Sequence, residues 1–264
     1  MTGQRYGVVA DVHANLFALR TALEHLQAAG IDRLLSLGDV IGYGPHPVEC
    51  VELLASFDPI AVAGNHEQIA LGQLSDERCT EAARRSLAWT RTRLTDDVRA
   101  ALAELPATAA APGVLLAHGS PERIDEYVRS EARASELLDT MHAQHPATDV
   151  LLLGHTHQAW LFSRRRGTLL RERAGRIDLV PGELLLLNPG SVGQSRDRHA
   201  HARFLTLDLG QRTAQFHSVP YDARACRRAL RDRGLPPEWC HIVPPPMERL
   251  RGVAGDVLRR AGLR

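Results

Sequence analysis

The sequence contains no lysine, so arginine supplies all 32 basic side chains among its 264 residues. With 31 acidic residues the formal net charge is +1, and no overall field favours DNA, RNA or an anionic membrane as a partner. The abundance of alanine, leucine and arginine indicates genomic base composition rather than a functional signal. Hydrophobic residues at 44% and charged residues at 24% are ordinary for a soluble globular protein.

Cysteine and long apolar runs are also scarce. The four cysteines, Cys50, Cys79, Cys226 and Cys240, are widely spaced and form no CxxC pair, which excludes a disulfide scaffold and a zinc ribbon. Free thiols are typical of a reducing cytoplasm. No stretch approaches the roughly 18 apolar residues that cross a bilayer, and the N-terminus lacks the apolar segment of a secretory signal. We therefore expect a cytoplasmic protein without a membrane partner.

Apolar runs and amphipathic segments alternate along the first part of the chain. Residues 6–10, 33–37 and 60–63 predict buried strands, and residues 15–29 and 47–56 predict the helices between them. This strand–helix–strand rhythm indicates parallel pairing with crossover helices.

The later part of the chain is richer in strands. One or two helices are predicted within residues 76–105 and another over 130–144, with strands at 114–117 and 150–153. Beyond them the pattern becomes hairpin-like, with predicted strands at 160–162, 168–171, 184–187, 204–209 and 214–219.

The chain is long enough for one large α/β domain, and no linker or internal repeat divides it. A single domain is predicted over residues 1–243. Residues 244–264 begin with three prolines, typical of a stiff spacer, and continue as an amphipathic helix. We expect this segment to pack on the domain with its arginines in solvent, the alternative being a contact with nucleic acid or a membrane surface.

Five short motifs built around Asp, Asn or His punctuate the sequence, and most follow directly on a predicted strand. They are Asp11-Val12-His13, Gly38-Asp39, Gly64-Asn65-His66, Ala117-His118 and Gly154-His155-Thr156-His157. The arrangement brings seven nitrogen and oxygen donors for metal ions, and one further histidine, to the ends of several strands. One such motif would mean little, whereas five in a row indicate a two-metal hydrolase.

The residue types agree with that chemistry. Asp11 and His13 are two positions apart in an extended chain, so their side chains lie on the same side, and the same holds for His155 and His157. Imidazole suits zinc, iron and nickel, while carboxylate and amide oxygens suit manganese and magnesium. A carboxylate such as that of Asp39 has two oxygens and can bridge two ions.

Taken singly, most of these motifs have an ordinary structural explanation. The first could be a capped turn, the second a strand-to-loop turn, and the third a left-handed turn, since Gly and Asn tolerate positive φ. His118 alone could be a histidine at the edge of the core. Paired histidines such as His155 and His157 at the end of a buried strand are rare without a ligand. The joint pattern therefore favours the metal site.

The same series, spanning residues 8–157, resembles the calcineurin-like metallophosphoesterase superfamily. The likeness to its compact bacterial and archaeal branch of small phosphodiesterases and phosphatases continues through Gly42-Tyr43-Gly44-Pro45, His118-Gly119-Ser120-Pro121 and Asn188-Pro189-Gly190-Ser191. Ala10 stands where Gly or Ser is common in the family, and Ala14 stands where Gly is common. Neither replacement puts a ligand in doubt. The signature is specific for the superfamily and says little about the substrate.

The resemblance implies a fold and a division of roles. The fold is α/β, a four-layer α/β/β/α sandwich of two mixed β-sheets flanked by helices, with a dinuclear metal site at strand ends. One ion would be bound by Asp11, His13, Asp39 and His157, and the other by Asp39, Asn65, His118 and His155. His66 would be no ligand and would act beside the scissile phosphate as general acid or transition-state stabiliser. Two divalent ions are expected. Mn²⁺ is the preferred identity, with Fe, Zn, Ni and Mg as alternatives.

The resulting hypothesis is hydrolysis of a phosphodiester or phosphomonoester of a nucleotide or another small molecule. Two ions would lower the pKa of a shared water, metal-bound hydroxide would attack phosphorus, and His66 would assist the leaving group. The alternatives are a phosphoprotein (Ser/Thr) phosphatase and a non-catalytic metal-bound scaffold, and the intact motifs argue against the latter. Whether the protein forms a homo-oligomer stays open.

Residues around the motifs leave further alternatives. Tyr43 could stack on a base or pack against the next helix, and Arg196 could pair with a phosphate or stay in solvent. Residues 164–166, all arginines, lack interleaved aromatics and are typical of an exposed turn rather than a nucleic-acid patch. Asn15 and Thr156 are candidates for orienting the liganding histidines.

Overall fold

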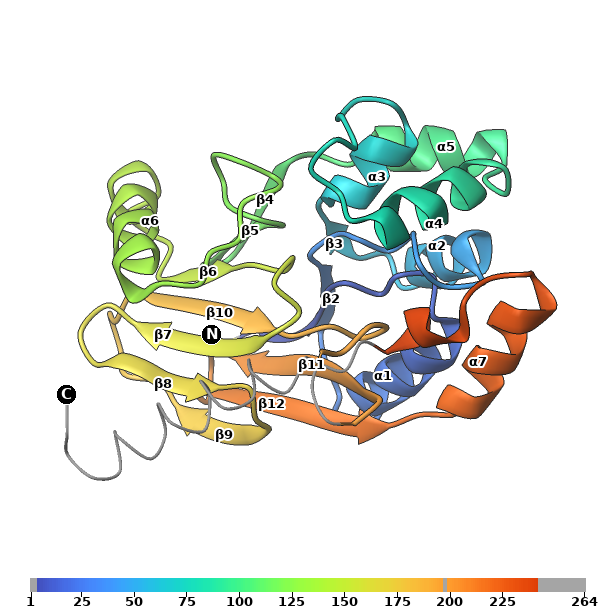
Figure 1. The fold of residues 1–264 in the computed structure, drawn as a ribbon. Coiled ribbons are helices and arrows are strands. Elements are labelled where there is room, and N and C mark those ends of the chain that lie inside the picture. The colour runs from blue at the N-terminus through green and yellow to red at the C-terminus, as the bar shows by residue number, and fades with distance from the viewer. Residues whose placement is uncertain (1–3, 197–198, 242–264) are drawn as a thin grey trace, which may run out of the picture.

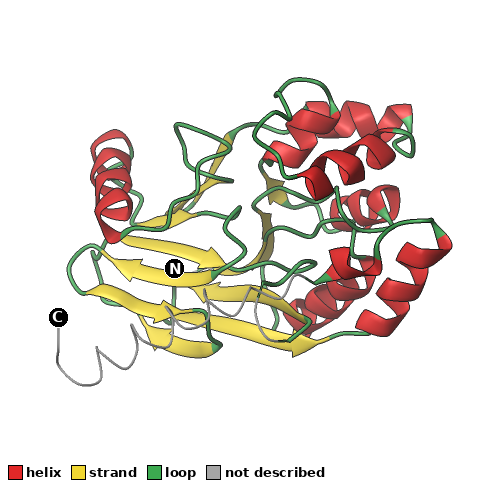
Figure 2. Ribbon diagram, in the orientation of Figure 1, coloured by secondary structure: helices red, strands yellow, loops and turns green. Residues whose placement is uncertain are grey.

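The computed structural model describes residues 4–196 and 199–241. Two six-stranded sheets pack face to face and helices cover their outer faces (Figures 1 and 2). The predicted four-layer α/β/β/α sandwich is therefore confirmed. Residues 244–264 lie outside the described residues, so the spacer, the helix and the domain boundary there remain predictions.

The first sheet combines three parallel strands with three antiparallel ones. In pairing order its strands are β3 (Ile60–Ala61), β2 (Arg33–Ser36), β1 (Arg5–Val9), β11 (His201–Asp208), β12 (Thr213–Pro220) and β9 (Gly175–Asp178). Strands β1, β2 and β3 run parallel to one another, as predicted, and Val8 of β1 pairs with Leu35 of β2 on one side and Leu205 of β11 on the other.

The second sheet has the same mixed character. In pairing order its strands are β4 (Thr108–Ala111), β5 (Val114–Ala117), β6 (Val150–Leu152), β10 (Leu185–Pro189), β7 (Ala159–Ser163) and β8 (Gly167–Arg171). Strands β5, β6 and β10 are mutually parallel. Each sheet thus contains three parallel strands whose carboxyl ends lie at one edge.

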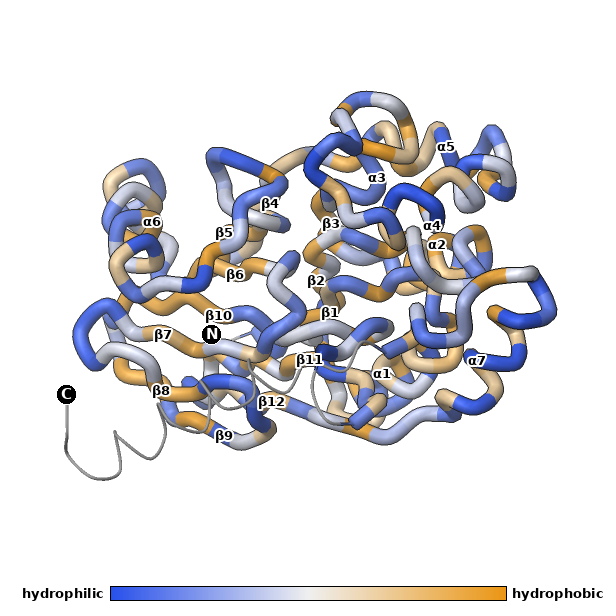
Figure 3. The backbone as a smooth tube through the Cα atoms, in the orientation of Figure 1, coloured by the Kyte–Doolittle hydropathy of each residue, from blue (hydrophilic) through white to orange (hydrophobic). Residues whose placement is uncertain are grey.

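The core between the sheets follows from the alternation of side chains along each strand. Val8 of β1 points into the layer between the sheets, where it belongs to the same cluster as Leu116 of β5 and Leu187 of β10. Its neighbour Val9 points outward and packs with Phe204 under the helices. Figure 3 shows hydrophobic segments along the paired strands, while the helices alternate hydrophobic and hydrophilic positions.

The helices are α1 (Leu16–Ala28), α2 (Pro47–Ala55), α3 (Asn65–Ala70), α4 (Glu81–Arg91), α5 (Asp96–Ala103), α6 (Glu131–Gln144), α7 (Ala223–Asp232) and a 3-10 turn η1 (Pro237–Cys240). Helix α1 buries Leu19, Leu23 and Leu26, which recur every three or four residues and so form one stripe against the first sheet. Helix α6 covers the outer face of the second sheet (Figure 1).

The structure adds elements that the sequence pattern did not predict: β4, β9, α3, α7 and η1. Strands β4 and β9 are short and only partly buried, so they carry a weak apolar signal. Residues 76–105 form two helices, α4 and α5, separated by a break before the N-cap residue Thr95.

All four cysteines are free thiols. Among the described residues, no helix is long and apolar enough to cross a membrane. The predicted cytoplasmic location stays a prediction.

Candidate metal centre

The carboxyl ends of the parallel strands from both sheets meet at the candidate site. Asp11 and His13 follow β1 and Asp39 follows β2. His118 follows β5, and His155 follows β6. Asn65 and His66 open α3, directly after β3, and His157 lies two residues beyond His155. All eight predicted site residues are at most 7% exposed, so the centre is enclosed by protein.

One group of predicted ligands consists of Asp11, His13 and His157, whose ligand atoms all lie within 4.8 Å of one another. His157 Nε2 is 3.4 Å from Asp11 Oδ1 and 3.0 Å from His13 Nε2. His13 and His157 are 144 residues apart in the sequence, so only the packing of the two sheets brings them together.

The second group consists of Asp39, His118 and His155, again within 4.8 Å of one another. His118 Nε2 lies 3.3 Å from Asp39 Oδ2 and 3.1 Å from Asn65 Oδ1. Asp39 Oδ2 is also 3.8 Å from His13 Nε2 of the first group. The structure therefore brings all seven predicted ligands together, with Asp39 between the two groups.

The hydrogen bonds of the imidazoles define their tautomers. Nδ1 of His13 lies 3.2 Å from the carbonyl oxygen of Ile41, and Nδ1 of His157 lies 2.8 Å from that of Gln194. A carbonyl oxygen only accepts, so each Nδ1 carries the proton and each Nε2 presents a lone pair. Two buried lone pairs 3.0 Å apart repel one another unless a cation lies near both.

His118 is held in the same way, with Nδ1 at 2.7 Å from the carbonyl oxygen of Leu37. Burial alone would lower the pKa of His118, but the carboxylates of Asp39 and Asp11 outweigh burial and raise it to about 9. That shift reflects negative charge gathered in the centre, which a divalent cation would offset.

Two ligand atoms are buried without a hydrogen-bond partner, Asp11 Oδ2 and His155 Nε2. Burial raises the pKa of Asp11 to about 8 and lowers the pKa of His155 to about 3. Buried polar atoms are normally paired, and these two point to a missing cationic partner. The carboxylate, amide and imidazole donors therefore fit divalent metal ions.

The backbone is strained at these same positions. Asp11, His13, Asp39, His155 and His157 have φ values between 48° and 64°. Each such non-glycine residue costs of order 1 kcal/mol, and this strain typically persists at functional sites. Five of the seven predicted ligands are therefore held in a conformation that local preference alone would not select.

His66 lies close to both groups, and with His13 and Asp39 it forms a third set whose ligand atoms lie within 4.8 Å of one another. Its Nε2 is 3.9 Å from Asp39 Oδ2, and its backbone N–H donates to Asp39 Oδ1 at 2.9 Å. The ring packs against Tyr43, with centroids 5.1 Å apart, and its Nδ1 is buried without a partner. Tyr43 is only 6% exposed and also contacts the rings of His13 and Trp239. Tyr43 belongs to a cluster with Leu230 of α7 and Trp239 of η1 that contains no residue of α2, the helix that follows it. It therefore packs, but against other elements than predicted, and stacking on a base stays a prediction.

Comparison with known proteins agrees with this geometry. The model of the calcineurin-like phosphoesterase superfamily domain matches residues 5–212, well over half of the chain. The chain belongs to the calcineurin-like phosphoesterase superfamily. Membership implies a phosphoester hydrolase that depends on metal ions, as the sequence motifs predicted.

Relatives extend the match to nearly the whole chain. A metallophosphoesterase from Sphaerobacter thermophilus is 31% identical, with a TM-score of 0.77, and the alignment covers 90% of this chain and 97% of that one. An uncharacterized protein of Methanocaldococcus jannaschii is 29% identical over 90% of this chain and 96% of its own. A hypothetical protein from Pyrococcus horikoshii shares the fold, with a TM-score of 0.72 and 19% identity. The alignment covers 89% of this chain and 96% of that one.

Two predictions about orienting residues in this phosphoesterase chain are wrong. Asn15 caps α1 and donates its side-chain N–H groups to the carbonyl of Gly193 and the hydroxyl of Tyr221. Thr156 Oγ1 accepts hydrogen bonds from Asn188 and Gln158. The observed acceptors of the Nδ1 protons of His13, His118 and His157 are backbone carbonyls, which a sequence motif does not reveal.

No role was predicted for three neighbours of the centre. Glu67 lies beside Asp39 and is fully buried. It stands three residues after the N-cap Gly64, as the glutamate of a capping box does, and this spacing could have predicted its contact with the start of α3. Asn188 donates to the carbonyl of Gly154 at 2.5 Å and so ties β10 to the loop after β6. Tyr127, 47% exposed, covers the ring of His155 with centroids 4.0 Å apart, and no local pattern marks it.

The arginines singled out from sequence differ in their surroundings. Arg164 pairs with Asp139 and Arg166 with Glu183, so two members of the arginine run are engaged within the domain. Arg196 forms no ion pair with any residue in the described ranges, and its Nε is buried without a partner. Its positive charge acts on the centre, since it adds to burial in lowering the pKa of His157.

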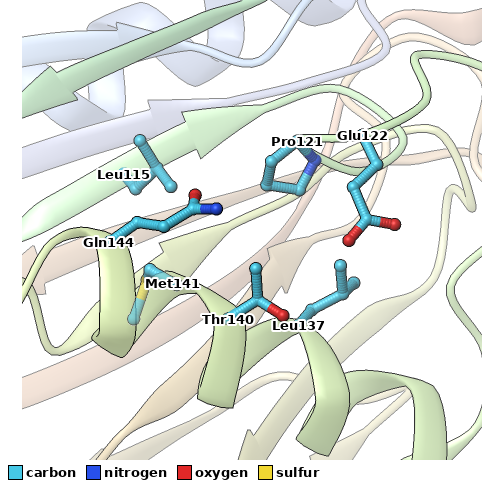
Figure 4. A pocket seen from close by; sticks show the side chains of 7 residues that line it. All are labelled: Leu115, Pro121, Glu122, Leu137, Thr140, Met141 and Gln144. Atoms are coloured by element: carbon cyan, nitrogen blue, oxygen red, sulfur yellow. The ribbon is translucent and has the colours of Figure 1, made fainter.

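A separate pocket lies between α6 and the loop after β5 (Figure 4). Its lining is Leu115, Pro121, Glu122, Leu137, Thr140, Met141 and Gln144. Its carboxylate, Glu122, is paired with Arg133, and the lining contains none of the eight predicted site residues. The eight predicted site residues are therefore gathered at the strand ends, apart from this pocket.

Proposed function

We propose that this protein is a dinuclear metal-dependent phosphoesterase that hydrolyses a phosphodiester or phosphomonoester of a nucleotide or another small molecule. The observation that carries the proposal is the pair of imidazole lone pairs on His13 and His157, 3.0 Å apart in a buried site, with Asp39 Oδ2 3.8 Å from His13 Nε2. The imidazole lone pairs and the carboxylate of Asp39 converge there, and this is the environment that a divalent ion requires.

The ligands divide between two ions. One would be held by Asp11, His13, Asp39 and His157, and the other by Asp39, Asn65, His118 and His155. A mixed set of nitrogen and oxygen donors favours Mn²⁺, with Fe, Zn, Ni and Mg as alternatives. When bound, divalent ions lower the pKa of water and offset the charge of phosphate oxygens.

His66 stabilises the leaving group in this proposal. Burial lowers the pKa of its imidazole, so the ring is neutral near pH 7 and can carry a proton on Nε2, the nitrogen that faces Asp39. Its hydrogen bond to Asp39 Oδ1 through the backbone and its packing on Tyr43 fix where that nitrogen points. From there the Nε2–H group donates a hydrogen bond to the leaving oxygen and stabilises the negative charge that develops on it as the ester bond breaks, and water protonates the released oxygen.

Arg196 binds the phosphate in this proposal. The chain leading to it runs beside the centre: Gly193 N donates to the carbonyl of Asp11 at 3.1 Å, and the carbonyl of Gln194 holds His157. The guanidinium of Arg196 lies beside the centre, its Nε is buried without a partner, and it forms no ion pair with a carboxylate among the described residues. Such a group is suited to bind a non-bridging phosphate oxygen.

The test is an activity panel with bis-p-nitrophenyl phosphate, p-nitrophenyl phosphate and a phosphopeptide, each with Mn²⁺ and with chelator. We expect turnover of a small ester that chelator abolishes and that Asp39→Ala removes. His66→Ala should keep its bound Mn²⁺ and lose about 10²- to 10⁴-fold in kcat. Arg164→Ala is the control: Arg164 pairs with Asp139, which is not a predicted site residue, so this variant should keep wild-type activity.

Each alternative has its own outcome in this panel. Turnover of the phosphopeptide alone would favour a phosphoprotein phosphatase. Absence of turnover on all three substrates, with Mn²⁺ still bound, would favour a non-catalytic scaffold. Activity of Asp39→Ala equal to that of the wild type would contradict the assignment of the centre itself.

A further inference from the structure

Glu67 is a buried carboxylate beside Asp39 that the proposed mechanism does not use. Its side chain is completely buried at the start of α3, one residue after His66. Burial of a carboxylate is costly unless every lone pair is satisfied, so its partners need an explanation.

Four backbone N–H groups donate to this carboxylate. Oε1 accepts from Val40 at 2.9 Å and from Ile41 at 3.1 Å, and Oε2 accepts from Asp39 at 2.8 Å and from Gly64 at 2.7 Å. An ionised carboxylate offers about four lone-pair positions, and all of them are taken. Glu67 is therefore unavailable as a metal ligand, although it lies in α3 directly after His66.

The four donors come from the two loops that carry the central ligands. Asp39, Val40 and Ile41 belong to the loop after β2, and Gly64 precedes Asn65 at the start of α3. The two loops touch without spare room, because a Cβ on Gly64 would lie 2.2 Å from Asp39 Oδ1. The carboxylate of Glu67 hydrogen-bonds to both segments where they touch.

This contact also sets the direction of the Asp39 side chain. Asp39 has φ 53°, a strained value that the hydrogen bond from its N–H to Glu67 helps to maintain. With the backbone so held, Asp39 Oδ1 accepts from His66 N, and Oδ2 is directed toward His118 and His13 at 3.3 and 3.8 Å.

We propose that Glu67 is a positioning residue that clamps the loop of Asp39 to the loop of Asn65 and His66, and thereby sets the spacing of the two metal positions. The proposal rests on the dinuclear centre proposed above. Glu67 acts through the backbone of its neighbours and contacts neither the metal ions nor the substrate.

The experiment compares the wild type, Glu67→Gln and a matched control, Glu183→Gln. In Glu67→Gln the amide NH₂ would face two N–H donors, so half of the clamp becomes repulsive. Glu183 is also buried and hydrogen-bonded, to Ser163 and Arg166, but contacts none of the predicted ligands. Mn²⁺ binding is measured by titration calorimetry, and the exchange-coupled signal of a bridged Mn²⁺ pair by EPR, on protein shown to be folded by circular dichroism.

We expect Glu67→Gln to weaken Mn²⁺ binding about 10- to 100-fold, the range typical of residues that support metal ligands, and to diminish the coupled signal. Glu183→Gln should bind Mn²⁺ as the wild type does, even though it is less stable. If Glu67→Gln is not folded at the assay temperature, Glu67→Asp, which keeps the charge but shortens the reach, is measured against the same control.

Two results would overturn the proposal. One is wild-type affinity and coupling in the Glu67 variant; the other is equal weakening in the Glu67 and Glu183 variants, which would assign the effect to general stability. A wild-type protein that binds a single Mn²⁺ would contradict the dinuclear centre instead, and the comparison of the two variants on that one ion would still decide the role of Glu67.

Discussion

Gly42→Ala perturbs His66 without changing any predicted ligand. An added Cβ at position 42 would lie 2.1 Å from His66 Nδ1, whereas real Cβ contacts are essentially never under 3.0 Å. The ring must therefore retreat by about 0.9 Å, the difference between those two distances. Tyr43 and His13 pack against the ring, so the displacement cannot be absorbed by a free rotation.

The expected cost is in catalysis. A misplacement of about 1 Å in a catalytic group can lower the rate about 100-fold, and we expect kcat to fall by that order. Gly42 also has φ +86°, so alanine adds a backbone penalty of about 1 kcal/mol to the free energy of folding. Metal content should be unchanged, because His66 is not a predicted ligand.

Gly72→Ala supplies the control. Gly72 has φ +76°, and a Cβ there would meet no atom within 4 Å, so this variant carries the backbone penalty without the contact to His66. Both variants are assayed for kcat on bis-p-nitrophenyl phosphate with Mn²⁺, for bound metal and for thermal unfolding. Equal kcat in the two variants would refute the reasoning that the position of His66 limits the reaction.

Further predictions concern stability and metal linkage. Glu183→Gln should lower the free energy of unfolding by about 2 kcal/mol through loss of charged hydrogen bonds. The hydrogen bonds from Arg166 and then Ser163 lower the pKa of the Glu183 carboxyl in the folded protein. The stability that Glu183 contributes is therefore complete above the pKa of about 4.3 that a glutamate has in the unfolded chain, and it is lost as the pH falls through the lower pKa of the folded state. Urea titrations of wild type and Glu183→Gln from pH 3 to 7 should give free energies of unfolding that converge at the acid end. Leu116→Ala, at a fully buried position between the sheets, should cost about 3 kcal/mol in the same assay, and a loss under 1 kcal/mol would contradict the packing described. Mn²⁺ at 100 times its Kd should stabilise the wild type by about 2.7 kcal/mol, and Asp11→Asn should lose most of that increment in a thermal melt.

Much of the fold could be predicted because its signals are local. Strands β1 and β2 of the first sheet are short apolar runs, and each is followed by a helix that the sequence pattern predicts, α1 and α2 respectively. The elements that escaped prediction have weaker signals. Strand β9 alternates partly buried and exposed residues, and α7, with the charged sequence ARACRRALRD, buries only Cys226 and Leu230.

The candidate site shows the same division. Its eight residues were predicted from motifs that are contiguous in sequence, because the order of residues after a strand places their side chains at its end. The partners of those residues were not predicted. The acceptors for His13, His118 and His157 are carbonyls, and a carbonyl carries no residue-specific signal.

The sequence by itself therefore determined which donor atoms the protein possesses, the strand end at which each lies, and the superfamily to which the motifs belong. Tertiary structure alone decided the distances. His13 and His157 come from different sheets and approach to 3.0 Å only when the sheets pack, and the carboxylate of Glu67 joins two loops that follow different strands. The physical reason is that chemical identity is a local property of the chain, while spacing between remote segments depends on the packing of the whole core.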